Sequence, residues 1–176
     1  GMLVVARSRP GCELVSWVHT AVDGLDLPRR FDLIVMMGHA FQVLLEDDDV
    51  RTALANLRRH LAPGGRLAFE TRNPLVREWE HWTPGKSRET IEVPGQGPVE
   101  VENDILQAEG ELVTFQTRFR FPDGEVVAVP HTLRFMSRRR LAQLVAEAGF
   151  ADVVWYGDWD RSPLARTSPE IIVIAG

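Results

Sequence analysis

Two side chains with useful chemistry come directly after apolar runs that resemble strands. His39 follows the run 31–37, and Arg72 follows the run 66–71. Because imidazole titrates near neutral pH, His39 could act as a general base toward a hydroxyl group or an amine. Arg72 could hold a carboxylate or a phosphate in a bidentate fork. The alternative is that Gly38 forms a simple turn and His39 is a polar loop residue.

Aromatic and acidic residues follow other predicted strands. Trp79 and Trp82 are three residues apart and would share one face of a short helix, where they either line a substrate pocket or pack the fold together. Asp158 and Trp159 come after the next-to-last predicted strand. Ligands in open α/β sheets bind at the carboxyl ends of the strands, so these four residues and Arg134 are candidate substrate-binding residues.

Composition narrows the classes of function. The 176 residues suit a single domain, 1–176, and the net charge of −5 comes without the basic stripe that nucleic-acid binding needs. No apolar run reaches the length of a membrane helix, so we expect neither a nucleic-acid partner nor a membrane partner. The single cysteine, Cys12, rules out a disulfide within the chain and favours a cytoplasmic location. No cluster has metal-ligand spacing, and the acidic run 46–49 is interpreted as a helix cap.

Helices and strands that alternate along the chain would position these residues. The first part predicts a parallel sheet, with the run 31–37 buried on both faces. Between residues 86 and 136, closely spaced β-like runs with glycine-containing turns predict an antiparallel meander inserted into this α/β frame. We predict a helix at 2–9, a strand at 13–18, a helix at 50–61 ended by Pro63-Gly64-Gly65, meander runs at 87–93, 99–107, 111–121 and 125–135, a helix capped by Ser137 and ended by Gly149, and strands at 153–156 and 171–174.

Three segments together resemble class I S-adenosylmethionine-dependent methyltransferases. The segment 31–35 is similar to the fourth strand of that family, 61–67 (L-A-P-G-G-R-L) to its turn into strand five, and 148–150 (A-G-F) to its approach to strand six. The resemblance implies an incomplete Rossmann-like sheet from the family order 3-2-1-4-5-7-6. It also implies that the insert 86–136 covers a small-molecule substrate, with S-adenosylmethionine as the methyl donor.

The resemblance also places the cofactor. In the family a glycine-rich turn after strand one and an acidic residue after strand two hold the nucleoside, and neither is present in this sequence. The residues that would contact the cofactor are Ala21 and Val22, after the predicted strand 13–18, and Met37 and Gly38, after the buried run. Ala21 stands where the family usually has an acid that binds adenine.

We therefore expect a methyltransferase that is truncated at its amino terminus and impaired in this form. Either the gene start is wrongly assigned, or the protein is a remnant that no longer binds the cofactor. Without the first two strands, the apolar edge of the run 31–37 would pair with the strand 13–18 or with a second chain, so a homodimer is expected. The alternative function is a non-catalytic binding or dimerisation module.

Overall fold

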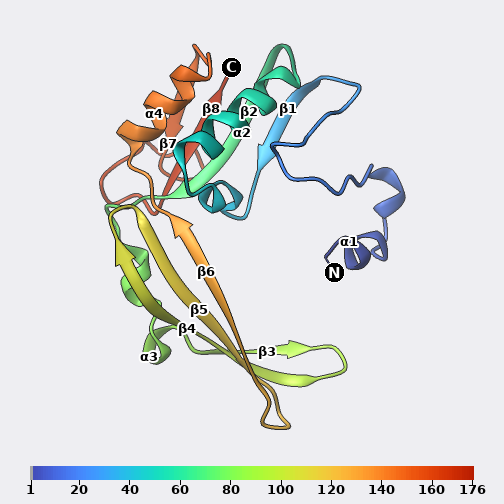
Figure 1. Ribbon diagram of the computed structural model, residues 1–176, viewed down its shortest axis with the longest axis vertical. Coiled ribbons are helices and arrows are strands. Elements are labelled where there is room, and N and C mark those ends of the chain that lie inside the picture. Colours follow the sequence, from blue (N-terminus) through green and yellow to red (C-terminus); the bar gives the residue numbers. More distant parts are fainter. Residues whose placement is uncertain (1) are drawn as a thin grey trace.

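The computed structural model describes residues 2–176, which form two four-stranded sheets (Figure 1). Gly1, the first residue of the predicted domain, lies outside the described residues. In chain order the elements are α1 (Met2–Arg7), η1 (Cys12–Leu14), β1 (Phe31–Met36), η2 (Ala40–Val43), α2 (Asp47–Arg59), β2 (Leu61–Arg72), η3 (Glu78–His81), α3 (Pro84–Ser87), β3 (Glu89–Val93), β4 (Gly97–Glu109), β5 (Leu112–Arg120), β6 (Val126–Arg134), α4 (Arg138–Glu147), β7 (Val153–Tyr156) and β8 (Glu170–Ala175).

The first sheet has the strand order β1-β2-β8-β7. β1 and β2 are parallel, whereas β8 runs antiparallel to both β2 and β7. This is the order 4-5-7-6 within the sheet that the sequence resemblance implied. The predicted α/β class with a Rossmann-like sheet and a meander is therefore confirmed. Among residues 2–176, no helix has both the length and the apolar composition that a membrane crossing requires.

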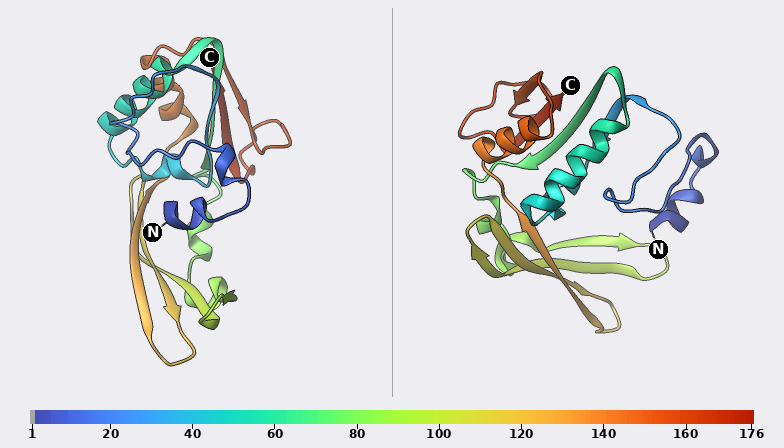
Figure 2. Two further views of the ribbon diagram at one scale, coloured as in Figure 1. Left: turned by 90° about the vertical axis from the view of Figure 1, so that its right-hand side faces the viewer. Right: turned by 45° about the horizontal axis from the view of Figure 1, so that its top comes forward.

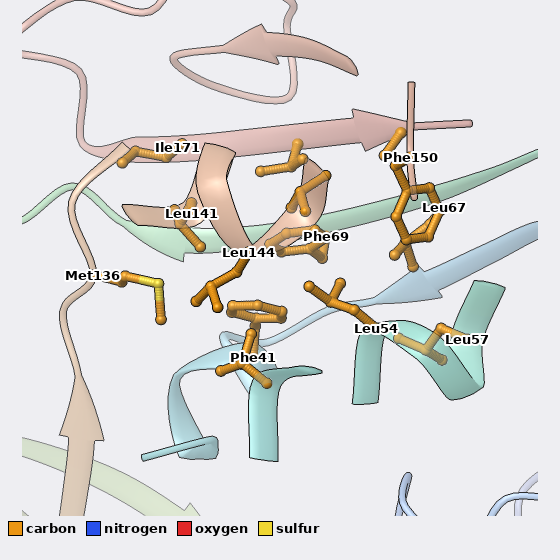
Figure 3. Close-up of a cluster of buried hydrophobic side chains, with 14 of the residues drawn as sticks. Phe41, Leu54, Leu57, Leu67, Phe69, Met136, Leu141, Leu144, Phe150 and Ile171 are labelled. Carbon is orange, nitrogen blue, oxygen red and sulfur yellow. The ribbon is translucent and has the colours of Figure 1, made fainter. Parts of the chain in front are cut away.

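Both long helices, α2 and α4, pack on one face of this sheet and form the core (Figure 3). Leu54 of α2 and Leu144 of α4 are fully buried beside Phe69 of β2. The ring of Phe69 stacks on that of Phe41 with centroids 4.2 Å apart. This packing holds β2 firmly in the centre of the sheet, and the candidate site lies at the carboxyl end of that strand.

The helix α2 begins three residues before the predicted start at Val50. The side chain of Glu46 accepts a hydrogen bond from a backbone N–H of the first turn, and Asp49 bonds back to the backbone of Glu46. This capping box, with acidic residues in the first turn, complements the partial positive charge at the helix start. The interpretation of the acidic run 46–49 as a cap is confirmed.

The second sheet is the predicted meander, in the order β3-β4-β5-β6 with antiparallel pairing throughout. It extends away from the first sheet as a long twisted ribbon (Figure 1). Polar contacts fix its base, because Gln42 Nε2 donates to the carbonyl oxygen of Arg134 at 3.1 Å and Arg134 Nη2 lies 2.8 Å from Asp47 Oδ1. The cover predicted at 86–136 therefore has a defined attachment to the α/β part.

The prediction that the turn Pro63-Gly64-Gly65 ends the helix is wrong, because α2 already ends at Arg59. Instead these residues form a bulge inside β2, where the register with β1 shifts between Phe31 and Leu33. Gly64 has a φ of 79°, and a Cβ on Gly65 would stand 2.7 Å from the carbonyl oxygen of Phe31. The glycines let β2 approach the backbone of β1 closely.

The strand predicted at 13–18 is wrong. Cys12–Leu14 form a 3₁₀ helix, and the chain then continues without pairing toward β1, at the side of the molecule (Figure 2). Local contacts hold this segment instead, since Trp17 Nε1 donates to the carbonyl oxygen of Cys12 at 3.1 Å. The apolar pattern alone cannot make a strand, because its ladder needs a neighbour and no strand lies beside it in residues 2–176.

The prediction that β1 is buried on both faces is also wrong. Leu33 and Val35 are 59% and 52% exposed, because α2 and α4 cover only the opposite face of the sheet. In the described part of the chain, β1 pairs with β2 alone. The suggested pairing of residues 13–18 with this edge is therefore not formed.

Candidate functional site

The candidate site begins at the sharp turn that follows β1. Gly38 and His39 both have left-handed backbone conformations, with φ of 70° and 59°. This conformation costs a non-glycine residue such as His39 free energy, of order 1 kcal/mol, so the surroundings must stabilise it. The N–H of His39 donates to Glu70 Oε1 at 3.0 Å, and the N–H of Gly38 also bonds to that carboxylate. Glu70, in the neighbouring strand β2, thus fixes the turn.

Glu70 is a buried carboxylate, only 6% exposed. Trp159 Nε1 donates to its second oxygen, Oε2, at 2.5 Å. Burial by itself raises the pKa of the Glu70 carboxyl group, but the hydrogen bonds from His39, Trp159 and Gly38 outweigh it and lower the pKa below its ordinary value. Glu70 is therefore a charged structural residue that links β1, β2 and the loop after β7.

The imidazole ring of His39 has a carboxylate partner of its own. Its Nε2 lies 2.9 Å from Oε1 of Glu170, the first residue of β8, and both side chains are partly buried. Because β8 lies beside β2 in the sheet, Glu70 holds the backbone of His39 while Glu170 holds its ring. An imidazole oriented by a carboxylate is an arrangement suited to proton transfer.

His39 lines a cleft of about 480 Å³ between the carboxyl edge of the first sheet and the meander. Its walls come from the turn after β1, the end of β2, Trp82, and inward-facing residues of β3, β4, β5 and β6. The polar residues of the lining include His39, Arg72, Glu89, Asn103, Thr117 and His131. The cleft thus has the position, size and mixed lining of a small-molecule site.

Arg72 and Trp82 form one wall of this cleft, as the sequence suggested. The guanidinium carbon of Arg72 lies 5.2 Å from the ring centroid of Trp82, and Nη1 donates to Gln42 Oε1 at 2.9 Å. Arg72 Nε also lies 2.7 Å from Glu78 Oε2. The guanidinium already has an internal carboxylate neighbour, so a ligand anion would have to compete with Glu78.

Four other candidate substrate-binding residues lie outside the cleft lining, and one of them, Trp159, donates to Glu70 instead. Arg134 is paired with Asp47 and with Glu111, each at 2.8 Å, and anchors the end of β6. Trp79 packs edge-on against Phe135, with centroids 4.4 Å apart. Asp158 is exposed and accepts a hydrogen bond from the N–H of Trp159.

The four candidate cofactor-binding residues lie in two different regions of the structure. Met37 and Gly38 lie at the carboxyl edge, with Met37 53% exposed, and no heavy atom lies within 4 Å of a Cβ built on Gly38. Val22 instead lies near the far end of α2, where Asn56 Nδ2 donates to its carbonyl oxygen at 2.9 Å, and the adjoining Ala21 is exposed. Of the four predicted cofactor residues, only Gly38 lines the cleft, and Met37 precedes it at the carboxyl end of β1.

Sequence patterns alone did not identify Glu70 and Glu170 as residues of the site. Glu70 interrupts an otherwise apolar strand at the centre of the sheet, and a charged residue there needs compensating partners. That interruption was a usable signal. Glu170 stands next to an apolar run as an ordinary strand boundary, so its contact with a residue 131 positions away is visible only in the fold.

A larger cavity of about 720 Å³ lies elsewhere, beside β7 and the start of α4. Three arginines and several apolar residues line it, and no carboxylate or imidazole does. Since proton transfer needs a titratable group of suitable pKa, the smaller cleft with His39 is the better candidate for chemistry.

Comparisons with known proteins find similarity to methyltransferases. A family model described as a methyltransferase domain matches residues 1–65. A glycine/sarcosine N-methyltransferase of Aphanothece halophytica is 29% identical over 140 residues, which cover 77% of this chain and 48% of the relative. Curated relatives are covered over 48% and 45% of their own length, so the chain spans about half the length of the curated relatives it matches.

Solved structures share the fold. The CcbJ methyltransferase from Streptomyces caelestis is similar with a TM-score of 0.75 at 17% identity, over 99% of this chain and 68% of that protein. CalS10, an amino pentose methyltransferase from Micromonospora echinaspora solved with S-adenosylmethionine bound, has a TM-score of 0.67 at 21% identity, over 99% of this chain and 69% of that protein. At these identities the comparison establishes the fold.

Proposed function

Because the chain has the fold of class I S-adenosylmethionine-dependent methyltransferases and resembles them in sequence, we propose that it contains the part of such an enzyme that binds the methyl acceptor. The acceptor is a small-molecule amine that enters the cleft between the sheet and the meander. The observation that carries this proposal is the carboxylate-held imidazole of His39 at the carboxyl edge of the sheet, inside a cleft of small-molecule size.

Two observations support an amine as the acceptor: the lining of the cleft and the substrates that the names of similar proteins mention. One curated relative is named for N-methylation of glycine and sarcosine, and one solved relative for methylation of an amino pentose. The lining offers hydrogen-bonding side chains beside the aromatic surface of Trp82. In this proposal Trp82, Asn103 and Thr117 orient the acceptor, while Arg72 shapes the wall next to its polar end.

S-adenosylmethionine would supply an electrophilic methyl group, which an amine lone pair attacks in line. The described residues fit this group on one side only. The open space at Gly38 and the exposed Met37 suit the methionine end near the cleft, whereas residues 2–176 contain no glycine-rich turn between a strand and a helix for the nucleoside. We therefore propose that this chain by itself binds the cofactor weakly and transfers methyl groups slowly.

The chain's own residues position the acceptor and accept its proton. The cleft walls restrict the amine to one approach, and such orientation supplies much of the acceleration of a displacement reaction. His39 accepts the proton that the nitrogen loses, and Glu170 stabilises the imidazolium that results. Trp159, which donates to Glu70, helps to hold the turn that carries His39.

Calorimetric titration of S-adenosylmethionine into the chain, followed by mass spectrometry of a panel of small amines, tests the proposal. We expect weak cofactor binding and slow methylation of at least one amine, with methylation reduced about 10²- to 10⁴-fold in His39→Ala. His81→Ala, at an exposed position outside the cleft, is the control. Cofactor binding without methylation of any amine would favour the second candidate, a non-catalytic binding module.

A further inference from the structure

His39 is held at two points by carboxylates from two adjacent strands. Glu70 of β2 accepts the backbone N–H at 3.0 Å, and Glu170 of β8 contacts the ring at Nε2 at 2.9 Å. The backbone bond sets where the side chain leaves the turn. The ring contact sets how the imidazole plane is rotated and which nitrogen remains available.

The contact with Glu170 selects one tautomer. A carboxylate can only accept hydrogen bonds, so Nε2 must carry the proton that is shared with Glu170. In the neutral ring Nδ1 then carries the lone pair. No other group in residues 2–176 donates to or accepts from Nδ1, and His39 lines the cleft. The basic nitrogen is thus left for a ligand in the cleft.

Glu170 is well placed to act as a fixed support. The residues that follow it, Ile171, Ile172 and Val173, are each at most 1% exposed, and the residue before it accepts a backbone hydrogen bond from Asn73 at 2.9 Å. Its second oxygen, Oε2, is buried and has no hydrogen-bond partner among the described residues. A buried carboxylate with a single imidazole neighbour is best stabilised when that imidazole is charged.

We infer that Glu170 is a positioning residue that holds His39 as the Nε2–H tautomer, so that Nδ1 accepts the acceptor's proton. This step rests on the proposed function. The amine lone pair forms the new N–C bond, the electron pair of the S–C bond remains on the donor's sulfur, and the N–H proton of the acceptor moves to Nδ1. The imidazolium then pairs with Glu170 until it releases the proton to water.

Long-range ¹H–¹⁵N NMR spectra of the full chain, labelled with ¹⁵N at histidine, identify the tautomer of His39 without requiring any methyl transfer. The signals of His39 are identified by their loss in His39→Asn, and spectra are recorded at about pH 8.5, well above the usual imidazole pKa of about 6.5. We expect the Nε2–H form in the wild type. An Nδ1–H form would overturn the inference, and this reading holds even if a variant at position 170 fails to fold.

Two substitutions at Glu170 separate its roles. Glu170→Ala removes the acceptor and is expected to give a mixture of tautomers, whereas Glu170→Asp keeps a carboxylate that can only accept and should favour the Nε2–H form over that mixture. Where an amine is methylated, Glu170→Ala should lower kcat about 10- to 100-fold with a smaller effect on KM, which is less than the roughly 10²- to 10⁴-fold loss expected when the base itself is removed. Glu92→Ala, an exposed carboxylate on β3 with no ion pair among the described residues, is the matched control.

An unchanged tautomer ratio in a folded Glu170→Ala variant would overturn the positioning role. Failure of the proposed function gives a different result. In that case the tautomer and its response to Glu170→Ala appear as expected, but neither cofactor binding nor methylation of any amine is observed.

Discussion

At the scale of single residues, Glu70 determines the geometry of the site. It receives N–H groups from both residues of the strained turn and from the indole of Trp159. A non-glycine residue in the left-handed region persists only where neighbouring structure enforces it, and Glu70 does so for His39. The charged form of Glu70 is therefore part of the folded structure.

Glu70→Gln should destabilise the protein by about 1–3 kcal/mol at neutral pH. The amide of glutamine has an NH₂ group in place of one oxygen, and this group cannot accept a hydrogen bond, so one of the N–H groups that the carboxylate accepts would lose its partner. The folded-state pKa of Glu70 lies below its ordinary value of 4.5, so its contribution is complete above that pH and is lost as the pH falls through the folded pKa. Urea unfolding across this range is the measurement.

The exposed Glu125→Gln serves as the control for this experiment and should change the free energy of unfolding by less than about 0.5 kcal/mol. The difference between wild type and Glu70→Gln should shrink below pH 4.5 and be constant above it. A difference that grows toward acid pH would contradict the assigned role of Glu70.

The residues of the cleft could be predicted in part. His39, Arg72 and Trp82 were predicted as site residues, and all three line the cleft. They were predictable because ligands bind at the carboxyl ends of the strands, a rule that can be applied once the strands are assigned. The rule cannot separate a cleft residue from one that packs nearby. Trp79 and Arg134 follow the same pattern, yet they contact Phe135 and Asp47. Glu170 was missed because its partner is distant in sequence.

At the scale of elements, local signals predicted most of the structure. The meander strands, the helix capped by Ser137 and the last two strands lie within a few residues of their predicted positions. The side chain of Ser137 accepts the expected hydrogen bond from the N–H of Arg140. Predictions failed where the structure of a segment depended on another element that packs against it. Residues 13–18 found no partner strand, and β1 found no cover for one face.

Gly65→Ala tests the bulge that joins β1 to β2. A methyl group at this position would stand 2.7 Å from the carbonyl oxygen of Phe31 and 3.0 Å from that of Ala62, both backbone atoms. We expect a loss of about 1–3 kcal/mol in the free energy of unfolding, because the strands must separate to admit it.

Gly85→Ala is the matched substitution, since it lies in the short helix α3 and no heavy atom lies within 4 Å of its added Cβ. It should be neutral or slightly stabilising by restricting the unfolded chain. Equal unfolding midpoints for the two variants, measured by circular dichroism in urea, would argue against a close approach at Gly65.

At the scale of the whole molecule, one face of the first sheet is partly open. Val35, Ala68, Ile174 and Val154 lie in register across all four strands on the face opposite α2 and α4. Val35 and Val154 are 52% and 42% exposed. A continuous apolar row of this kind favours association with another surface.

We therefore expect the chain to form a homodimer through this face. Replacing both Val35 and Val154 by lysine should weaken association at least about tenfold, because two apolar contacts are lost from each copy. Val126→Lys, on an exposed position of the meander, should leave it unchanged. Light scattering coupled to size-exclusion chromatography measures the mass, and a monomeric wild type at high concentration would refute the dimer.

The ion pairs of Asp47 have a consequence for how new specificities could arise. This single carboxylate at the start of α2 pairs with Arg134, where the meander ends, and with Arg140, in the helix that follows. The meander, whose strands face the cleft, is thus anchored at the end of β6, directly after Leu133, the last residue of that strand in the cleft lining. We expect those strands to be exchangeable as a cassette between relatives, provided that the Asp47 junction travels with them.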